Sequence, residues 1–211
     1  YSWGANVPHV ARLVEGVHID AVIALEMKDP VTRNRADVVL FGLDRSGAQR
    51  AIVLELKQWS SFEPVEDDPQ SVRANLHGAR FDATLHPSLQ AAQYARRLRH
   101  WVHACDEDQP NAVRTSAYAL LFNMAEPQIG MIREGQYAPT QTDAPTLGAP
   151  EIDVLAASLR RDLGGGDGQS VYERIATSEI RQSRRFVEFA VGVLKGREIF
   201  ELIPEQMLAY A

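Results

Sequence analysis

The sequence lacks several features that would indicate particular classes of protein. It has one cysteine, Cys105, so no internal disulfide can form, which is typical of a reducing compartment. No stretch approaches the ~18 apolar residues of a membrane span, and the first residues, YSWGANVPHV, lack the basic start and apolar block of a signal peptide. We therefore expect a cytoplasmic location and no membrane partner.

Positive charge is also scarce. The 22 Lys and Arg residues are outnumbered by 28 Asp and Glu, and the net charge of −6 gives no overall attraction for a polyanion. The Gly-x-x-x-x-Gly-Lys-Ser/Thr pattern of a P-loop is absent, so nucleotide hydrolysis of that type is not expected within this chain. Two local basic clusters remain, RRLRH (96–100) and IRQSRR (180–185), and each is either a solvated helix face or a phosphate-binding surface.

The first half of the chain has a clear order of elements. With 211 residues and 45% hydrophobic residues, the chain fits one domain, with or without an appendage. Apolar spacing predicts a helix over 8–15, strands over 21–27, 37–43 and 51–59, a helix over 86–102 and a strand over 116–124. The segment DRSG (44–47) predicts a hairpin turn. A helical crossover between the third and fourth strands predicts a parallel pair and thus a mixed α/β sheet.

The second half gives weaker signals. A polar connection is expected between the third strand and the helix at 86, a Pro- and Thr-rich loop over 137–150, a Gly-rich break over 163–168, and one or two helices over 170–196. We therefore expect a core over 1–135, a loop-rich connection over 136–169 and a helical extension over 170–211.

Two charged residues interrupt the third strand, AIVLELKQWS (51–60). Glu55 and Lys57 share one strand face, where buried charges need partners or a metal. Folding the hairpin at Ser46 places Asp37 opposite Glu55, with about 5 Å between their Cβ atoms. Two carboxylates this close repel each other unless a cation lies between them, and oxygen ligands suit Mg²⁺ or Mn²⁺. With Lys57 nearby, the set predicts phosphodiester hydrolysis.

This pattern resembles the PD-(D/E)XK nuclease superfamily, with Ala36 where the name has Pro. The resemblance implies a restriction-endonuclease-like mixed sheet flanked by helices, metal binding by Asp37 and Glu55, and catalysis by Lys57. On the following helix, QAAQY places Gln90 and Tyr94 on one face and is similar to the Q-x-x-x-Y motif of RecB-like nucleases, which faces the active site. The alternative is a Tyr packed in the core and a solvated Gln.

A narrower resemblance concerns the segments RNRADVVLFG, VLELKQW and HPSLQAAQYA. They look like the N-terminal nuclease-like domain of bacterial Schlafen-like P-loop helicases. In those proteins a segment like IFELIPEQMLAYA (199–211) leads into the ATPase core. The resemblance implies a helicase domain in the same full-length chain, or a standalone relative, and a role in bacterial defence or DNA repair.

Several further residues are candidates. Glu26 is either an additional metal ligand or a surface acid, and so is Glu15. Arg35 is either a phosphate contact or a salt-bridge partner. Expected nucleic-acid contacts on the helix are Arg96, Arg97 and Arg99. A zinc site built from His100, His103 and Cys105 is disfavoured, because the set lacks a second pair of ligands, and Trp59 is expected in the core.

The expected function is that of a metal-dependent nuclease acting on DNA, with RNA as another substrate to test. One alternative is an inactive nuclease fold that binds nucleic acid or a protein partner. The other is a structural domain in which Lys57 pairs with Asp37 or Glu55.

Overall fold

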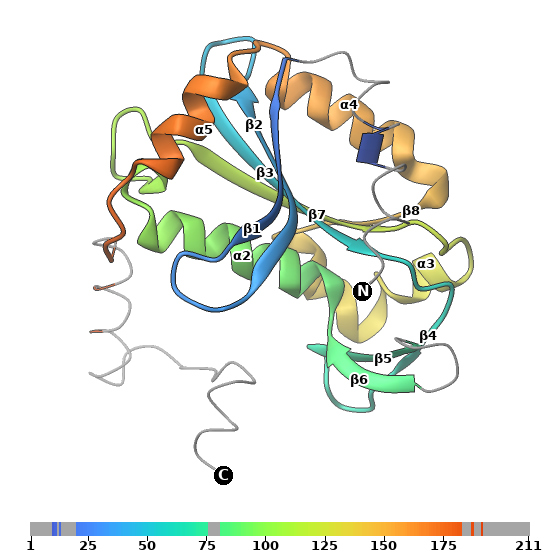
Figure 1. The fold of residues 1–211 in the computed structure, drawn as a ribbon. Coiled ribbons are helices and arrows are strands. Elements are labelled where there is room, and N and C mark those ends of the chain that lie inside the picture. Colours follow the sequence, from blue (N-terminus) through green and yellow to red (C-terminus); the bar gives the residue numbers. More distant parts are fainter. Residues whose placement is uncertain are drawn as a thin grey trace.

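The structure is a computed structural model, and it describes residues 10, 11, 13, 20–75, 81–182, 187 and 191. A five-stranded mixed sheet forms its centre (Figure 1). The strands follow the order β1 (Val22–Lys28), β2 (Arg35–Leu43), β3 (Gln49–Lys57), β7 (Arg114–Leu121) and β8 (Thr146–Gly148). The pairs β1–β2 and β2–β3 are antiparallel, whereas β3–β7 and β7–β8 are parallel. The predicted mixed α/β sheet is thus confirmed.

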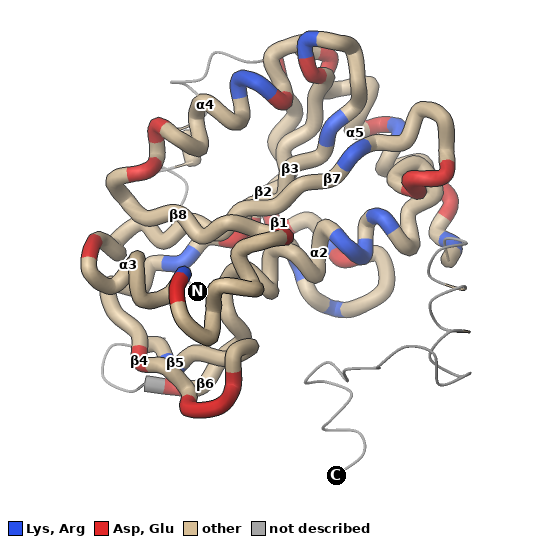
Figure 2. Tube along the Cα trace, turned by 180° about the vertical axis from the view of Figure 1, so that it is seen from behind, with Lys and Arg blue, Asp and Glu red and all other residues tan. Residues whose placement is uncertain are grey.

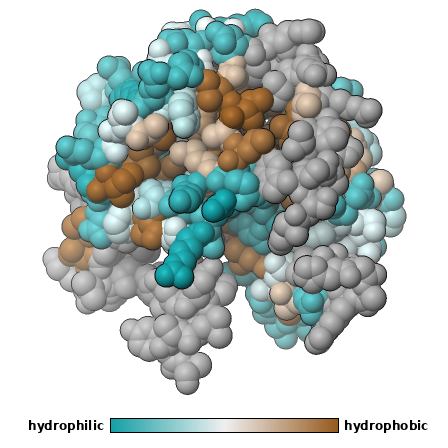
Figure 3. Space-filling view, in the orientation of Figure 1, coloured by the Kyte–Doolittle hydropathy of each residue, from teal (hydrophilic) through white to brown (hydrophobic). Residues whose placement is uncertain are grey.

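Helices cover both faces of this sheet. Helix α2 (Pro87–Trp101) and helix α5 (Gly168–Ala176) pack on one face, where Phe41 and Val53 are fully buried. Helix α4 (Ile152–Leu163) packs on the other face against Leu40 and Leu54. The central strands β2 and β3 are therefore apolar on both sides, which explains their continuous hydrophobic runs. Edge strand β1 is less covered, with Leu25 46% exposed, and Figure 3 shows apolar surface in the region where β1 lies in Figure 1.

The β2–β3 turn has the predicted chemistry. Gly47 adopts φ +84°, which glycine tolerates without steric cost, and its N–H donates to the carbonyl of Asp44 (2.9 Å). The helix expected over 8–15 lies mostly outside the described residues, although Val10, Ala11 and Leu13 are helical. The strand expected over 116–124 begins two residues earlier and ends at Leu121.

A second, smaller sheet replaces the polar connection that we expected after β3. It contains β4 (Phe62–Pro64), β5 (Ser71–Asn75) and β6 (Phe81–Leu85), all antiparallel. Val72 and Ala74 alternate with exposed Arg73 and pack in a third cluster with Trp59 and Tyr137. The expected polar connection is therefore an ordered sheet with its own buried face, which the sequence analysis did not predict.

The second half of the chain is also more regular than expected. The segment expected to be a loop over 137–150 contains most of a 3₁₀ helix (Gly135–Thr142) and all of β8. The short helix α3 (Gln128–Met131) precedes it, and the 3₁₀ turn η4 (Ala149–Glu151) overlaps its end. A further 3₁₀ turn, η2 (His103–Cys105), follows α2. The predicted helix at 170 begins at Gly168 and ends at Ala176. Within the described residues, no helix is both long and apolar enough to span a bilayer.

Candidate active site

A row of three acids crosses the first three strands of the main sheet. The β2–β3 register pairs Val38 with Leu54, so its continuation by one residue places Asp37 opposite Glu55, as the hairpin predicts. The β1–β2 register pairs Leu25 with Val38 and Met27 with Ala36, which places Glu26 opposite Asp37 on the other side. Three neighbouring strands therefore each contribute one carboxylate at the same level of the sheet.

Asp37 occupies the middle of this row and is half-buried. Its Oδ2 accepts a hydrogen bond from the backbone N–H of Leu56 (2.7 Å). Burial, followed by the neighbouring Glu55 carboxylate, raises the pKa of Asp37 from 3.8 to about 7, against opposing effects of the Leu56 N–H and Lys57. Near neutral pH the Asp37 carboxyl group is therefore partly protonated.

Glu55 and Lys57 lie on one face of β3, as strand alternation predicts. The Lys57 Nζ forms an ion pair with Glu55 Oε1, and both side chains are only 12% exposed. The ammonium also lies 5.5 Å from the centre of the Trp59 ring. Trp59 itself is buried in the core, as expected. The two charges within this apolar strand are thus paired with each other.

Glu26 has an unusual backbone conformation within β1. Its φ is +51°, a left-handed value that costs a non-glycine residue about 1–3 kcal/mol. The side chain is 37% exposed, and its Oε2 lies 3.8 Å from Arg35 Nη1. Of the two interpretations of Arg35, the structure shows the salt bridge. A residue held in this conformation beside Asp37 marks a locally constrained point of the sheet.

Helix α2 bonds to the strand end that follows Glu26. The Tyr94 hydroxyl lies 3.0 Å from the Met27 carbonyl and 2.9 Å from the Lys28 carbonyl and donates to them. Burial raises the pKa of Tyr94. Gln90 instead donates from Nε2 to the carbonyl of Leu85 (2.8 Å), so its amide is tied to β6. The two motif residues therefore bond to different elements.

The three predicted nucleic-acid contacts on α2 all have acidic neighbours. Arg96 pairs with Asp143 (2.7 Å), and Arg99 Nη1 lies 3.6 Å from Glu107 Oε1. Arg97 Nη1 donates to Asp29 Oδ2 (2.8 Å), and the Asp29 side chain is fully buried. The structure gives Arg97 a packing role between α2 and the β1–β2 connection.

Asp29 is the residue that our sequence reasoning missed. Its Oδ1 accepts the N–H groups of Val31 and Thr32, both at 2.8 Å. The signal was available in the sequence, because an Asp followed by Pro30 is typical of a turn in which the carboxylate bonds to the backbone.

The carboxylates of Asp37 and Glu55 could bind a divalent cation, but they would provide only two protein ligands. Among the described residues, no group of three or more His, Cys, Asp or Glu is arranged to hold a metal ion. Mg²⁺ is usually bound through one or two carboxylates together with waters and substrate phosphates. Asp37 and Glu55, which provide only oxygen donors, fit that type of site, and Glu26 lies beside them without completing a ligand triad. Glu15 lies outside the described residues.

The residues considered for zinc do not converge on such a site. The His103 ring contacts Arg181 Nη2 at 2.6 and 2.9 Å, which places a cation where a metal would have to bind. Cys105 is buried, and burial raises the pKa of its thiol to about 12. The thiol is therefore protonated and packs as an apolar residue.

Comparisons of this chain with protein-family models, with curated proteins and with solved structures found no match.

Proposed function

We propose that the protein is a divalent-metal-dependent phosphodiesterase that cleaves DNA. The observation that carries this proposal is the position of Asp37 opposite Glu55, with Lys57 on the same face of β3. Burial and the adjacent carboxylate raise the pKa of Asp37 to about 7, which is the electrostatic situation that a bound cation would relieve.

Each of these side chains has a distinct role in the proposal. Asp37 and Glu55 would hold Mg²⁺ or Mn²⁺, and Asp37 would release its proton when the ion binds. When bound, such an ion polarises a phosphoryl oxygen and lowers the pKa of a coordinated water. Lys57 would place its positive charge beside the phosphate, where negative charge develops during the reaction. Its present contact with Glu55 keeps the ammonium oriented toward this part of the sheet.

The substrate assignment rests on the motif resemblance, which also suggests a P-loop helicase domain as a partner in the full-length chain. Asp37, Glu55 and Lys57 define the reaction, but they contact a phosphodiester in the same way in DNA and RNA. Both polymers therefore belong in the assay.

The test is incubation of the purified protein with labelled single- and double-stranded DNA and RNA, in Mg²⁺, Mn²⁺ or EDTA. We expect cleavage of DNA that requires the metal and disappears in Asp37→Asn. The matched control, Glu63→Gln, removes an exposed carboxylate on β4 and should cleave like the parent. Activity in EDTA, or equal activity of Asp37→Asn and the parent, would contradict the proposal.

The ion pair between Lys57 and Glu55 favours a second candidate, in which the nuclease fold is inactive and the charges are structural. In that case the protein binds nucleic acid or a protein partner without cutting. Titration with Mn²⁺ followed by calorimetry separates the two, because only the active site should bind the ion and lose that response in Asp37→Asn. The absence of a Mn²⁺ response that depends on Asp37, together with no cleavage of any of the four substrates, would favour the inactive fold.

A further inference from the structure

An arginine-lined hollow lies at the opposite end of strand β2 from the row of acids. It has a volume of about 520 Å³ and lies between the β2–β3 turn and the C-terminal part of α4. The lining residues are Asp44, Arg45, Ser46 and Arg50 from the hairpin, and Ala157, Arg160, Arg161 and Asp162 from α4. Asp44 follows Asp37 by seven residues, roughly 23 Å at the rise of a strand. The hollow is therefore separate from the candidate active site.

The lining of this hollow is strongly positive for such an acidic protein. It contains four arginines and two aspartates, a net charge of +2, whereas the whole chain has a net charge of −6. Figure 2 shows basic and acidic segments side by side at the β2–β3 turn and at the end of α4. The only apolar side chain in the lining is that of Ala157. A ligand would therefore be selected by its negative charge rather than by apolar contact.

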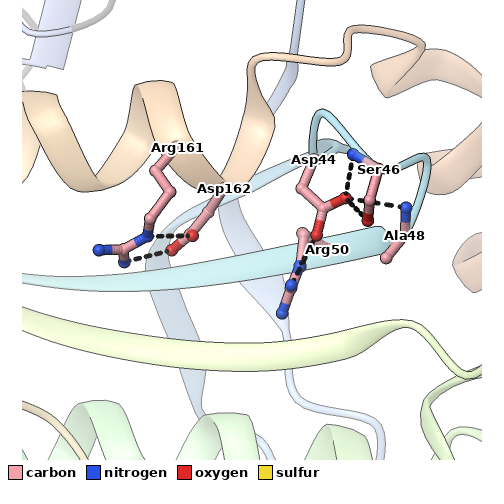
Figure 4. Close-up of polar contacts among 6 residues, drawn as sticks. All are labelled: Asp44, Ser46, Ala48, Arg50, Arg161 and Asp162. Carbon is pink, nitrogen blue, oxygen red and sulfur yellow. Dashed lines mark hydrogen bonds and ion pairs between the residues drawn. The ribbon is translucent and has the colours of Figure 1, made fainter.

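On the hairpin side, a dense set of hydrogen bonds fixes the position of Arg50. Asp44 Oδ1 accepts the Ser46 N–H (2.9 Å), the Ser46 hydroxyl (2.6 Å) and the Ala48 N–H (3.0 Å) (Figure 4). Asp44 Oδ2 accepts Arg50 Nε (3.0 Å) and Nη2 (2.6 Å). These donors hold the pKa of Asp44 far below its usual range, so the carboxylate stays charged and keeps Arg50 in place.

On the helix side, Arg161 is held in a similar way. Its Nε and Nη2 donate to the two carboxylate oxygens of Asp162, at 2.7 and 3.0 Å. Figure 4 shows this pair on α4 and the Asp44–Arg50 pair on the hairpin. Each aspartate of the lining is thus already bound to an arginine, and the lining contains two further arginines, Arg45 and Arg160.

The two walls of the hollow are also fixed relative to each other. The Gly165 N–H donates to the Leu43 carbonyl (2.8 Å), and the Leu43 N–H donates to the Gly166 carbonyl (2.7 Å). A Cβ on Gly165 would lie 2.2 Å from the Asp44 carbonyl oxygen, so only glycine allows this close approach. The turn after α4 therefore holds the helix end against the hairpin.

We infer that this hollow binds a dianionic phosphate group, as inorganic phosphate or as a phosphomonoester. Guanidinium groups match phosphate oxygens in planar, paired hydrogen bonds. The net charge of +2 in the lining matches the charge of a phosphomonoester, about −1.5 to −2 at neutral pH, better than the single charge of a phosphodiester. The inference does not depend on the proposed nuclease function, because no lining residue belongs to the row of acids.

The test is calorimetric titration of the protein with inorganic phosphate, at constant ionic strength maintained with chloride. We expect saturable binding that is weakened at least about tenfold in Arg45→Gln/Arg160→Gln, because each charge-assisted hydrogen bond contributes roughly a factor of ten. The matched control, Arg33→Gln/Arg73→Gln, removes the same charge from exposed arginines elsewhere and should bind phosphate like the parent.

Two further variants locate the site and protect the test against misfolding. Ala157→Glu keeps every arginine and adds a carboxylate on exposed helix surface in the hollow, so it should also weaken binding. Arg114→Gln alters a neighbouring hollow that shares Arg50, and it should leave the affinity unchanged. Circular dichroism establishes that each variant is folded.

Paired ligands identify the source of the phosphate. A nucleoside 5′-monophosphate against its nucleoside tests a free phosphomonoester, and a 5′-phosphorylated oligonucleotide against its 5′-hydroxyl form tests a nucleic-acid end. Either preference for the phosphorylated member supports the inference. It would be overturned by the absence of saturable phosphate binding, by equal affinity in the parent and both hollow variants, or by a loss confined to Arg114→Gln.

Discussion

The raised pKa of Asp37 predicts that this residue destabilises the metal-free protein at alkaline pH. The pKa of an unperturbed aspartate is 3.8, and that of Asp37 in the folded protein is about 7, mainly because of burial and then because of Glu55. A carboxyl group whose folded pKa is raised contributes stability fully below the unfolded pKa, and this contribution is lost as the pH rises through the folded pKa. Replacing Asp37 with asparagine should remove that loss.

The size of the effect follows from the shift. A shift of about three pKa units corresponds to roughly 4 kcal/mol over the full range, because each unit is worth about 1.4 kcal/mol. Between pH 5 and pH 8, the parent protein should lose roughly 3 kcal/mol of this contribution to its free energy of unfolding. The side-chain oxygen of the introduced asparagine can still accept the Leu56 N–H, so Asp37→Asn should preserve the local hydrogen bond.

His86 acts in the opposite direction, so the parent protein alone would not reveal the effect. Burial lowers the pKa of His86 from 6.5 to about 4. A histidine with a lowered pKa contributes stability above its unfolded pKa, and this contribution is lost as the pH falls through the folded pKa. Between pH 5 and pH 8 it should add roughly 2 kcal/mol, which nearly cancels the Asp37 loss. The comparison of parent and variant removes this contribution.

The assay is urea unfolding of both proteins at pH 5 and pH 8 in EDTA. We expect the free energy of unfolding of the parent to fall by roughly 3 kcal/mol more than that of Asp37→Asn between these pH values. Glu63→Gln, which removes an exposed carboxylate, should follow the parent. If the parent and Asp37→Asn change equally, the carboxylate is not held near neutrality and the electrostatic argument for the site fails.

Three other outcomes are expected. Lys57→Ala should reduce the proposed DNA cleavage by about 10²–10³-fold while Mn²⁺ binding persists, and cleavage at the parent rate would rule out a catalytic role. Gly165→Ala should lower the urea midpoint strongly, because its Cβ would lie 2.2 Å from the Asp44 carbonyl oxygen, and an unchanged midpoint would show that the turn is free to shift. The NMR signals of the His86 ring should titrate near pH 4, and titration near 6.5 would contradict its burial.

The central strands β2 and β3 could be predicted because their continuous apolar runs match their burial on both faces of the sheet and a recognisable turn joins them. The hairpin turn DRSG fixes the register of β2 against β3, and the register then determines that Asp37 lies opposite Glu55. The parallel β3–β7 pair followed from the intervening helix. In this part of the chain, the DRSG turn sets which residues of β2 and β3 lie opposite each other, and the alternation of side chains along β3 places Glu55 and Lys57 on one face.

Helix α4 was missed although its signal is present. Ile152, Leu155, Ala156, Leu159 and Leu163 recur at helical spacing, but they follow a Pro- and Thr-rich stretch that suggested a continuing loop. The small sheet was missed for a different reason. Its strands have only three to five residues, so the alternation of Val72 and Ala74 in β5, and of Phe81, Ala83 and Leu85 in β6, extends over too few residues to stand out. The packing against Tyr137 that stabilises them comes from a distant segment of the chain.

The partners of the charged residues could not be predicted, because they depend on tertiary contacts. Arg97 and Asp29 are 68 residues apart in the chain, and Arg96 and Asp143 are 47 apart. The sequence alone therefore suggests that the basic cluster can bind a ligand, because it does not show which acidic side chains the fold places beside these arginines. The conformation of Glu26 could not be predicted either, because nothing in the neighbouring sequence indicates a left-handed backbone at this residue.

The conformation of Glu26 and the hydrogen bonds of α2 belong to one arrangement. A strained φ persists only where the surrounding structure fixes the backbone on both sides. Directly after Glu26, the Tyr94 hydroxyl bonds to the Met27 and Lys28 carbonyls, and Arg97 bonds to Asp29, which in turn holds the N–H groups of the following turn. Helix α2 therefore fixes the end of β1 from Met27 onward, while pairing with β2 fixes the strand before Glu26. In this structure Tyr94 acts on the backbone that presents Glu26 beside Asp37, so its substitution should alter the site through the position of that strand end.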